Sequence, residues 1–331
     1  MKPQMQMFSQ GHVRLVTSFP VFSRGYAFLS LSGRRVLLIL EWLVMNSSII
    51  IREIDSITEM KALEKLQKEV WGWDDLDTMP LMNFIVTKEV GGALIGAFDG
   101  ETPIGFVFGF VGCHHGQIVF HSHMLAVLPQ FREHGIGHKL KLAQREQALA
   151  KGFTCITWTF DPLQSPNAYL NFTKLGVIAD DYRINFYGEQ TSSALHRFIG
   201  TDRLWVSWFL ESNRVRKRLE RVSDLDPCHE ELEKHVSLVE MGPDGSPHTR
   251  AISSPAPDYV LIDIPVDIGL LQGQNPELAV AWRNATRSAF TDALGAGYTV
   301  EEFYRIERQG QPGGCYLLSS KTPNGIDQNT K

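Results

Sequence analysis

Residues His121 to Leu140 read HSHMLAVLPQFREHGIGHKL, and this stretch decides the fold. Alternating apolar and polar residues predict a strand that runs through a short turn into a helix opened by glycine. Arg132, Gly135 and Gly137 form the pattern R-x-x-G-x-G, so small residues stand where backbone N–H groups approach a ligand. The open N-terminus of a helix carries unpaired N–H donors and a partial positive charge. The group that suits it best is a pyrophosphate.

The same glycine-rich turn also fits a dinucleotide site or a plain tight turn. It is not a Walker A loop, because Lys139 follows Gly137 by two positions and Leu140 stands where Ser or Thr would bind magnesium. The flanking segments make the pattern more specific. The strand residues Leu125 and Val127 lead through Pro129 into the turn, and NAYLNFTKLG, residues 167–176, follows the next predicted strand.

Together with the turn, these segments resemble motifs A and B of the GNAT acyltransferases, which bind acyl-CoA. The resemblance covers about residues 49–210, and its specific part lies between His121 and Gly188. The segments HSHM, WTFDPLQ and NFYG further resemble a bacterial subgroup of larger predicted acetyltransferases. The resemblance implies the α+β class and a GNAT fold, which is a mixed, splayed central β-sheet flanked by helices. It also implies transfer of an acetyl or succinyl group from acyl-CoA to an amine.

The composition favours a globular enzyme with a small acceptor. At 331 residues the chain predicts one large or two modest domains. Its net charge of −5 gives no general attraction to nucleic acid or to an anionic membrane, so we expect a small-molecule amine as the partner. The 4 cysteines form no C-x-x-C pair, which fits the reducing cytoplasm.

Residues 1–44 differ from the rest of the chain. They are basic and end in the apolar run VLLILEWLV, which is too short to span a bilayer. A signal peptide would need a cleavage site, and no A-x-A sequence follows the run. The GNAT-like pattern begins just after Met45. We therefore predict a disordered extension or an upstream mis-start, and loss of the fold on expression from Met45 would contradict this.

Strands and a helix are legible from Ile49 onward. A strand at 49–54 precedes a capping box formed by Ser56 and Glu59, which opens a helix to about residue 70. Residues 71–80 form an acidic, aromatic loop, in which Trp73 and Asp75 belong either to the acceptor pocket or to a solvated loop. Strands at 93–98 and 104–111 flank the hairpin turn Asp99-Gly100, and a third strand covers 118–127.

The helix opened by Gly135 should run to about Lys151, with its charged residues mostly facing water: Lys139, Lys141, Arg145 and Glu146. The strand at 156–160 must lie parallel to the strand at 118–127, because a helix connects them. A short helix at 167–175 and antiparallel strands at 179–187 and 204–210 complete the domain, which we assign to residues 45–221.

The rest of the chain predicts an addition to this domain. The arginines and lysine between residues 214 and 221 read as a solvated helix face, and the polar, proline-rich residues 222–257 read as a linker. A β-α-β-β unit occupies residues 258–320, and we expect it to pack on the GNAT sheet or to form a homodimer contact. Residues 321–331 are expected to be a disordered tail.

Acyl transfer to an amine needs a base, donors for the carbonyl oxygen and an acid for the departing thiolate. His121 and His123 share one face of their strand, and His121 matches the position where some GNAT enzymes carry a base glutamate. The alternative is that both are hydrogen-bonded core histidines. With His114 and His115 they also suggest a metal cluster, but no carboxylates stand nearby, so we expect no metal.

The resemblance assigns the acyl-CoA contacts. Backbone N–H groups near Leu125 or Val127 would polarise the thioester carbonyl, amides of the glycine turn would hold the pyrophosphate, and Asn167 would bind the pantetheine arm. The full set of cofactor-binding candidates is Leu125, Ala126, Val127, Arg132, Glu133, His134, Gly135, Ile136, Gly137, His138, Lys139, Asn167, Phe172 and Lys174.

One position departs from the family pattern. GNAT enzymes commonly have a tyrosine that protonates the thiolate, spaced Y-x-K-x-G, and this chain has Phe172 there. Tyr187, Tyr169 or water could replace it, or no acid is needed because a thiol's own pKa is low. Tyr187 completes the catalytic candidates with His121 and His123.

Three further residues, Asp161, Gln164 and Ser165, either face the acceptor or form a turn. None of the cysteines has a clear base partner, which favours direct attack in a ternary complex over an acyl-cysteine. A non-catalytic acyl-CoA-binding or regulatory protein is the alternative function, motivated by Phe172 and by the C-terminal unit.

Overall fold

The structure is a computed structural model that describes residues 6–7, 13–14, 49–114, 116–132, 134–188, 199–220 and 232–321. The chain divides into two compact units, Met1–Ser47 and Ser48–Lys331. In the first unit, strands β1 (Gln6–Met7) and β2 (Val13–Arg14) pair antiparallel. The predictions for the rest of residues 1–44 and for the tail after Lys321 lie outside the described residues.

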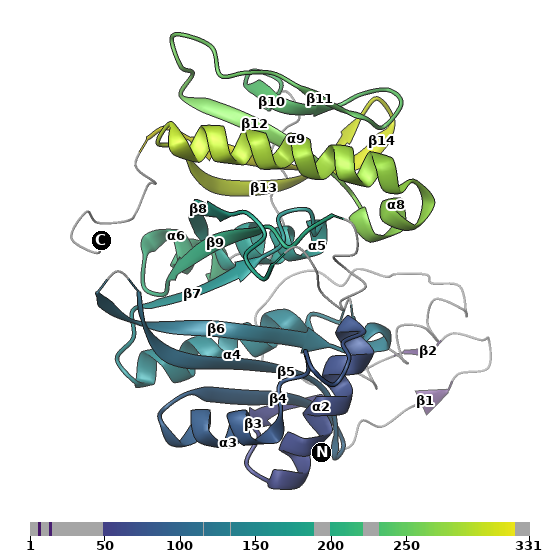
Figure 1. The fold of residues 1–331 in the computed structure, drawn as a ribbon. Helices are drawn as coiled ribbons and strands as arrows, with labels where there is room; N and C mark the ends of the chain where they lie inside the picture. Colours follow the sequence, from purple (N-terminus) through teal and green to yellow (C-terminus); the bar gives the residue numbers. More distant parts are fainter. Residues whose placement is uncertain are drawn as a thin grey trace. The chain divides into compact units, whose positions relative to one another are not determined.

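The described part of the second unit forms one mixed sheet of 12 strands in the order β11-β10-β12-β14-β13-β8-β9-β7-β6-β5-β4-β3 (Figure 1). Its strands are β3 (Ile49–Glu53), β4 (Ala93–Asp99), β5 (Thr102–His114), β6 (Gln117–Val127), β7 (Cys155–Phe160), β8 (Ile178–Arg183), β9 (Arg203–Phe209), β10 (Val236–Met241), β11 (Pro247–Thr249), β12 (Tyr259–Pro265), β13 (Thr299–Arg308) and β14 (Gln311–Ser319). The helical segments are α2 (Ile57–Trp71), α3 (Leu81–Glu89), η1 (Pro129–Phe131), α4 (Ile136–Ala150), α5 (Ser165–Ala168), the π-helical η2 (Tyr169–Leu175), α6 (Asn213–Glu220), α8 (Ile268–Gln274) and α9 (Pro276–Gly295).

Local signals near the start of this unit are confirmed. The Ser56 side chain accepts from the N–H of Glu59 and the Glu59 side chain from the backbone of Ser56, so the predicted capping box begins α2. Gly100 takes a positive φ of 60° in the turn between β4 and β5. Helix α3 was not predicted, because its short sequence LMNFIVTKE carries no side-chain cap at its N-terminus.

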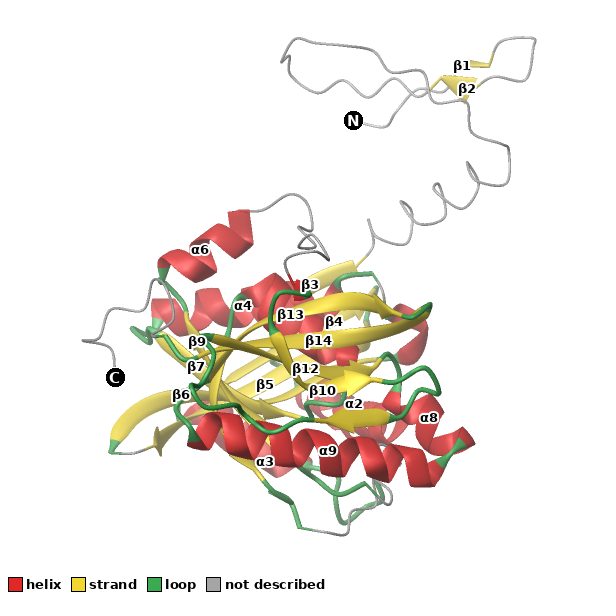
Figure 2. Ribbon diagram, turned by 90° about the horizontal axis from the view of Figure 1, so that it is seen from above, coloured by secondary structure: helices red, strands yellow, loops and turns green. Residues whose placement is uncertain are grey.

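Helices cover both faces of the sheet around β5 and β6. Phe84 of α3 packs edge-on against Phe106 and Phe108 of β5, so α3 lies on one face, together with α2. The residue after Phe108, Gly109, faces Gln144 of α4, which lies on the other face of the sheet. Figure 2 shows these layers from above. His121 and His123 contact Phe110, so they belong to the face of α2 and α3.

The predicted parallel pairing of β6 with β7 is confirmed, and it is short. Only Phe120 with Ile156 and His121 with Thr157 are in register. Both strands continue beyond this point, β6 to Val127 and β7 to Phe160, so they part after His121. This parting opens the sheet in the middle of the GNAT-like region.

The C-terminal unit continues the sheet instead of stacking on it. Strand β13 pairs antiparallel with β8 through Val300 and Ala179. The interpretation of residues 222–257 as a linker is wrong for 236–249, because β10 pairs parallel with β12, and β11 pairs antiparallel with β10. Strand β11 is the edge of the sheet, where Pro247 is tolerated because no further strand needs its missing N–H. The proline content therefore concealed an edge strand.

The interpretation of the basic run as a solvated helix face is also wrong in part. Arg214 and Arg218 of α6 are largely buried and form ion pairs with Glu302 of β13. Arg216, between them, is exposed. The run therefore helps to join the C-terminal strands to the first domain.

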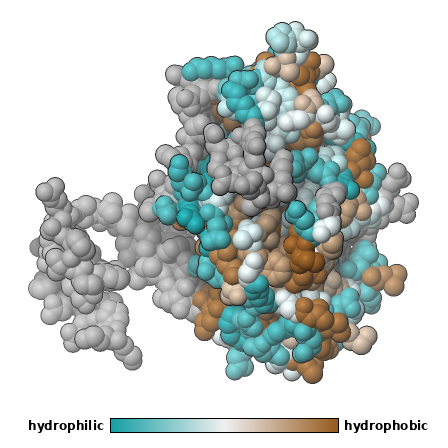
Figure 3. Space-filling model, turned by 90° about the vertical axis from the view of Figure 1, so that its left-hand side faces the viewer, coloured by the Kyte–Doolittle hydropathy of each residue, from teal (hydrophilic) through white to brown (hydrophobic). Residues whose placement is uncertain are grey.

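None of the helices described is both long enough and apolar enough to cross a lipid bilayer. On the face that Figure 3 shows, hydrophobic and hydrophilic side chains form separate small patches.

Candidate functional site

A cavity of about 620 Å³ occupies the parting of β6 and β7. The loop between α2 and α3 forms one side, with Trp73 stacked on Trp71 at 4.4 Å. Residues of β6, α4, β7 and η2 form the walls, and Tyr187, Thr201 and Arg203 close the other side. Trp73 therefore belongs to the cavity, as one of our two interpretations expected. Asp75 does not line it, since its side chain is 90% exposed and pairs with Lys68.

The N-terminus of α4 lies beside this cavity. Gly135 precedes the helix with a φ of 69°, and no side chain caps the helix. A Cβ built on Gly137 would lie 3.8 Å from Leu125 and from Leu170, and both of these residues line the cavity. The first amides of α4 are thus next to the cavity, with the side chains of Arg132 and Lys139 exposed around them.

The other candidates of the turn differ in position. His134 turns back, with its Nδ1 2.8 Å from the carbonyl oxygen of Arg132. His138 is half-buried, and burial followed by the charge of Lys174 lowers its pKa. Ile136 is buried in the core, so only its backbone can serve a ligand. Glu133 lies outside the described residues.

The two glycines make a matched pair of variants with opposite expected effects. Gly135→Ala should destabilise the protein by about 1–2 kcal/mol, because a side chain disfavours the left-handed conformation. Gly137→Ala, within the helix and without a clash, should stabilise it by up to about 1 kcal/mol. Urea unfolding followed by circular dichroism measures both. Equal effects of the two substitutions would contradict this account of the turn.

His121 and His123 occupy different positions. His121 Nδ1 lies 3.1 Å from Thr157 Oγ1, and His121 does not line the large cavity. The register between β5 and β6 skips His123, because Phe108 pairs with Met124 and Gly109 with Ser122. Such a bulge redirects a side chain, and His123 does line the large cavity. Of the two histidines, His123 is therefore the one placed to meet a ligand there.

Burial keeps both imidazoles in the uncharged form. Burial first, then the charges of His123, Lys141 and His114, lower the pKa of His121 to about 4. Burial lowers the pKa of His123 as well. An uncharged imidazole has a lone pair that can accept a proton from an amine. The arrangement therefore suits a base better than an acid at neutral pH.

This shift predicts a measurable pH dependence of stability. Between pH 6.5 and pH 4 the unfolded chain protonates His121 while the folded chain does not, so stability present above pH 6.5 is lost as the pH falls. Relative to His121→Asn, the wild-type protein should lose about 2 kcal/mol more between pH 8 and pH 5. Denaturant unfolding at both pH values measures the difference. His248→Asn, at an exposed position, should behave like the wild type.

Of the two tyrosines considered as acids, only Tyr187 lines the cavity. It lies in the turn after β8, although it is the last residue of the predicted strand, and its hydroxyl is 3.5 Å from Thr159 Oγ1. Tyr169 is buried beneath Arg305, whose guanidinium carbon lies 4.0 Å from the ring centre.

Some residues of the segment 167–176, which resembles motif B, line the cavity, and others lie in the core. Asn167 lines the cavity. Phe172 is fully buried, against Phe160 and Tyr316 at 6.2 and 5.7 Å between ring centres, and does not line the cavity. Lys174 lies with its Nζ 5.4 Å from the ring of Tyr169. Leu125 lines the cavity, while Ala126 is buried and Val127 half-buried beyond it.

Lys141 was missed by sequence reasoning. We expected it to face water, but it is 2% exposed and lines the cavity from α4. Its Nζ donates to Ser122 Oγ and to Gln144 Oε1, both at 3.0 Å, and lies 3.6 Å from the centre of the Trp158 ring. Burial lowers its pKa well below the ordinary value. The parting of the strands admits its side chain, and no helical periodicity could reveal that.

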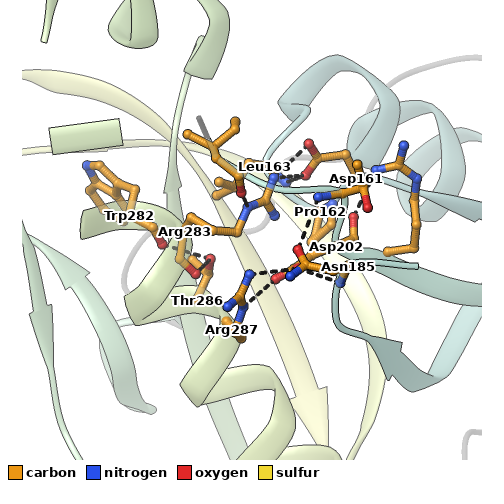
Figure 4. Close-up of polar contacts among 12 residues, drawn as sticks. Asp161, Pro162, Leu163, Asn185, Asp202, Trp282, Arg283, Thr286 and Arg287 are labelled. Atoms are coloured by element: carbon orange, nitrogen blue, oxygen red, sulfur yellow. Dashed lines mark hydrogen bonds and ion pairs between the residues drawn. The ribbon is translucent and has the colours of Figure 1, made fainter. Parts of the chain in front are cut away.

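The C-terminal unit supports the cavity through a buried ion pair (Figure 4). Arg283 of α9 donates through Nη2 to both carboxylate oxygens of Asp161, at 2.8 and 2.7 Å, and each side chain is 2% exposed. Burial alone would lower the pKa of Arg283, but the Asp161 carboxylate outweighs it and raises that pKa. Asp161 and Gln164 line the cavity, while Ser165 is buried and does not. The chain separates Arg283 and Asp161 by 122 positions.

A second pair lies beside the first. Arg287 donates through Nε and Nη2 to Asp202, at 2.8 and 2.9 Å (Figure 4). The Tyr182 hydroxyl donates to the same carboxylate at 2.7 Å. Asp202 directly precedes Arg203, which lines the cavity. Helix α9 therefore holds the segments that begin β9 and follow β7.

No group of three metal-binding side chains occurs in the part of the chain that the structure describes. His115, one of the histidines considered for zinc, lies outside that part.

Comparisons with known proteins give one family. The profile of the acetyltransferase (GNAT) family matches residues 57–176. No curated protein matches the chain.

Solved structures similar to the chain each cover about half of it. The ribosomal-protein-S18-alanine N-acetyltransferase from Escherichia coli is 13% identical, with a TM-score of 0.38 over 48% of this chain and 92% of that one. A GNAT family acetyltransferase from Elizabethkingia anophelis with acetyl-CoA bound is 18% identical, with a TM-score of 0.37 over 49% and 98%. The PaiA N-acetyltransferase from Thermoplasma acidophilum in complex with coenzyme A is 18% identical, with a TM-score of 0.35 over 48% and 98%.

Proposed function

Since this chain belongs to the GNAT superfamily of acetyltransferases, we propose that it is an acyl-CoA-dependent N-acyltransferase. It moves an acetyl or succinyl group to the primary amine of a small molecule, such as an amino acid, in the cytoplasm. The observation that carries the proposal is the cavity between the parted strands β6 and β7, which extends from the vicinity of the α4 N-terminus to His123 and Tyr187.

The residues at one end of the cavity fit a coenzyme A. The uncapped N-terminus of α4 offers the amides of Ile136, Gly137 and His138 to a pyrophosphate. Arg132 and Lys139 are exposed nearby and add positive charge. Asn167 is positioned in the cavity to bind the pantetheine arm. Because the ladder between β6 and β7 ends at His121, backbone donors of β6 near Leu125 can reach the thioester carbonyl.

The residues at the other end fit the transfer step. Bound acyl-CoA supplies a thioester, and the amine attacks its carbonyl carbon directly in a ternary complex. The uncharged His123 accepts the proton that the amine loses. The thiolate leaves as a weak base and takes a proton from Tyr187 or from water. Phe172 has no part in this step, because its ring is in the core.

Calorimetry with acetyl-CoA and succinyl-CoA, followed by a thiol-release assay over a panel of amines, tests the proposal. Binding together with amine-dependent release is the expected result. Binding without release from any amine would favour the alternative, a non-catalytic acyl-CoA-binding protein. If neither acyl-CoA binds, both functions are excluded.

A further inference from the structure

A second cavity, of about 290 Å³, opens beside the first over β5, β6 and β9. Its walls are largely aromatic: Phe110, His114, His121, Phe186 and Trp205. His114 stacks on Trp205 at 4.5 Å between ring centres, and His121 lies 5.1 Å from the same ring. The cavity is therefore shaped by the flat faces and edges of rings.

The two cavities share His123 and Tyr187 among the described residues that line them. These are the side chains to which the proposed function gives the proton transfers. A ligand that fills the second cavity and extends one short arm past His123 would reach the first. An acceptor amine needs this geometry: its carbon skeleton lies outside the acyl-CoA cavity, and its nitrogen lies at His123, the proposed base.

The residues that line the second cavity indicate which chemical group of the acceptor it would bind. Among the described lining residues of the second cavity there is no lysine or arginine, and burial favours the uncharged form of His121 and His123. Aromatic rings pair edge-to-face or offset with one another and gain more than their buried area alone provides. A dry cavity of about 150 Å³ can hold one benzene ring, so the second cavity has room for a ring and a short tether.

We propose that the second cavity is the acceptor pocket and that the acceptor is a primary amine carrying an aromatic ring on a short tether. The proposal rests on the proposed function, because it gives the transferred acyl group its destination. The ring lies against Phe110 and Trp205, and the amine lies at His123, which separates the pocket from the thioester.

Gly112 provides a variant that closes the pocket without strain. It lines the second cavity, and a Cβ built there meets no atom within 4 Å. Gly112→Trp therefore fills the pocket from an open position. Val111→Trp is the matched control, because Val111 is the neighbouring residue of β5, is exposed and lines neither cavity.

The experiment compares 2-phenylethylamine with propylamine as acceptors of the acetyl group from acetyl-CoA. In the full-length wild-type protein, kcat/KM should be about 10- to 100-fold higher for 2-phenylethylamine, which is the effect of burying one ring. Gly112→Trp should remove this preference by lowering kcat/KM for 2-phenylethylamine, and should leave the KM for acetyl-CoA within about twofold. Val111→Trp should change none of these values. Equal kcat/KM for the two amines, or an equal loss for both in Gly112→Trp, would overturn the proposal.

Direct binding separates this proposal from the proposed function. Calorimetry measures the affinity of 2-phenylethylamine for the protein saturated with coenzyme A. If no amine is acylated but 2-phenylethylamine binds and Gly112→Trp abolishes the binding, the pocket is correct and the enzymatic function is wrong. If acylation of other amines proceeds while 2-phenylethylamine neither binds nor reacts, the pocket assignment is wrong and the function stands. If 2-phenylethylamine does not bind and no amine is acylated, both are wrong.

Discussion

His123→Ala is expected to lower kcat by about 10²- to 10⁴-fold, the usual contribution of a positioned general base. The reason is its place on a β-bulge, where it lines both cavities and burial favours its uncharged form. Steady-state thiol release with the best acceptor measures the loss. Affinity for acetyl-CoA, measured by calorimetry, should stay within about twofold because the proposed pyrophosphate site lies at the N-terminus of α4.

His121→Ala is the matched comparison. His121 lines only the second cavity and lies beside Thr157, so its loss should reduce kcat less than about tenfold. A larger effect at His121 than at His123 would reverse the assignment of the base. Full activity of both single variants, with an unchanged pH profile, would exclude a histidine base altogether.

Arg283→Met should destabilise the protein by about 3–5 kcal/mol, because it removes the guanidinium that donates to both oxygens of the buried Asp161 carboxylate. The midpoint of urea unfolding measures this directly. The same change should also raise the KM for acetyl-CoA, since Asp161 lines the first cavity. The C-terminal unit is thereby expected to affect the proposed acyl-CoA site, although it carries none of the sequence motifs.

Two further variants isolate the buried charge as the cause. Asp161→Leu combined with Arg283→Met removes both charges and should recover most of the lost stability, because a buried pair contributes little beyond an apolar pair of similar volume. Arg216→Met removes an exposed arginine of α6 and should change stability by less than about 0.5 kcal/mol. If the double variant is as unstable as Arg283→Met alone, lost packing and not the loss of the ion pair with Asp161 is responsible.

Much of the first domain could be predicted from short segments. Ser56 with Glu59, Asp99 with Gly100, and Gly135 each fix a local conformation through their own backbone or through a neighbour within three residues. The parallel pairing of β6 and β7 also followed, because a helix connects them. The same local reasoning gave β12, α9, β13 and β14 of the C-terminal unit in their order, but it missed α8.

The expectations that were wrong have a common cause, which is contact between separate elements of the fold. Lys141, Arg214 and Arg218 were all expected in water because charged residues usually are. Each is buried by another element: Lys141 by the parted strands β6 and β7, and the two arginines by Glu302 of β13, which is far away in the chain. Strands β10 and β11 were hidden by polar and proline-rich composition, and β12, with which β10 pairs, follows later in the chain.

By itself the sequence determined the strand, turn and helix of residues 121–140, because those conformations depend on glycine, on alternation and on chain neighbours. It also determined the family, since the motif and its flanks are contiguous. Only the tertiary structure decided which histidine lines the cavity between β6 and β7, that Tyr187 and not Tyr169 lines it too, and that Arg283 contacts its wall from a distant part of the chain. These depend on a register shift, on the divergence of two strands and on a contact across 122 residues. Such effects arise from packing between distant segments, and no local pattern encodes them.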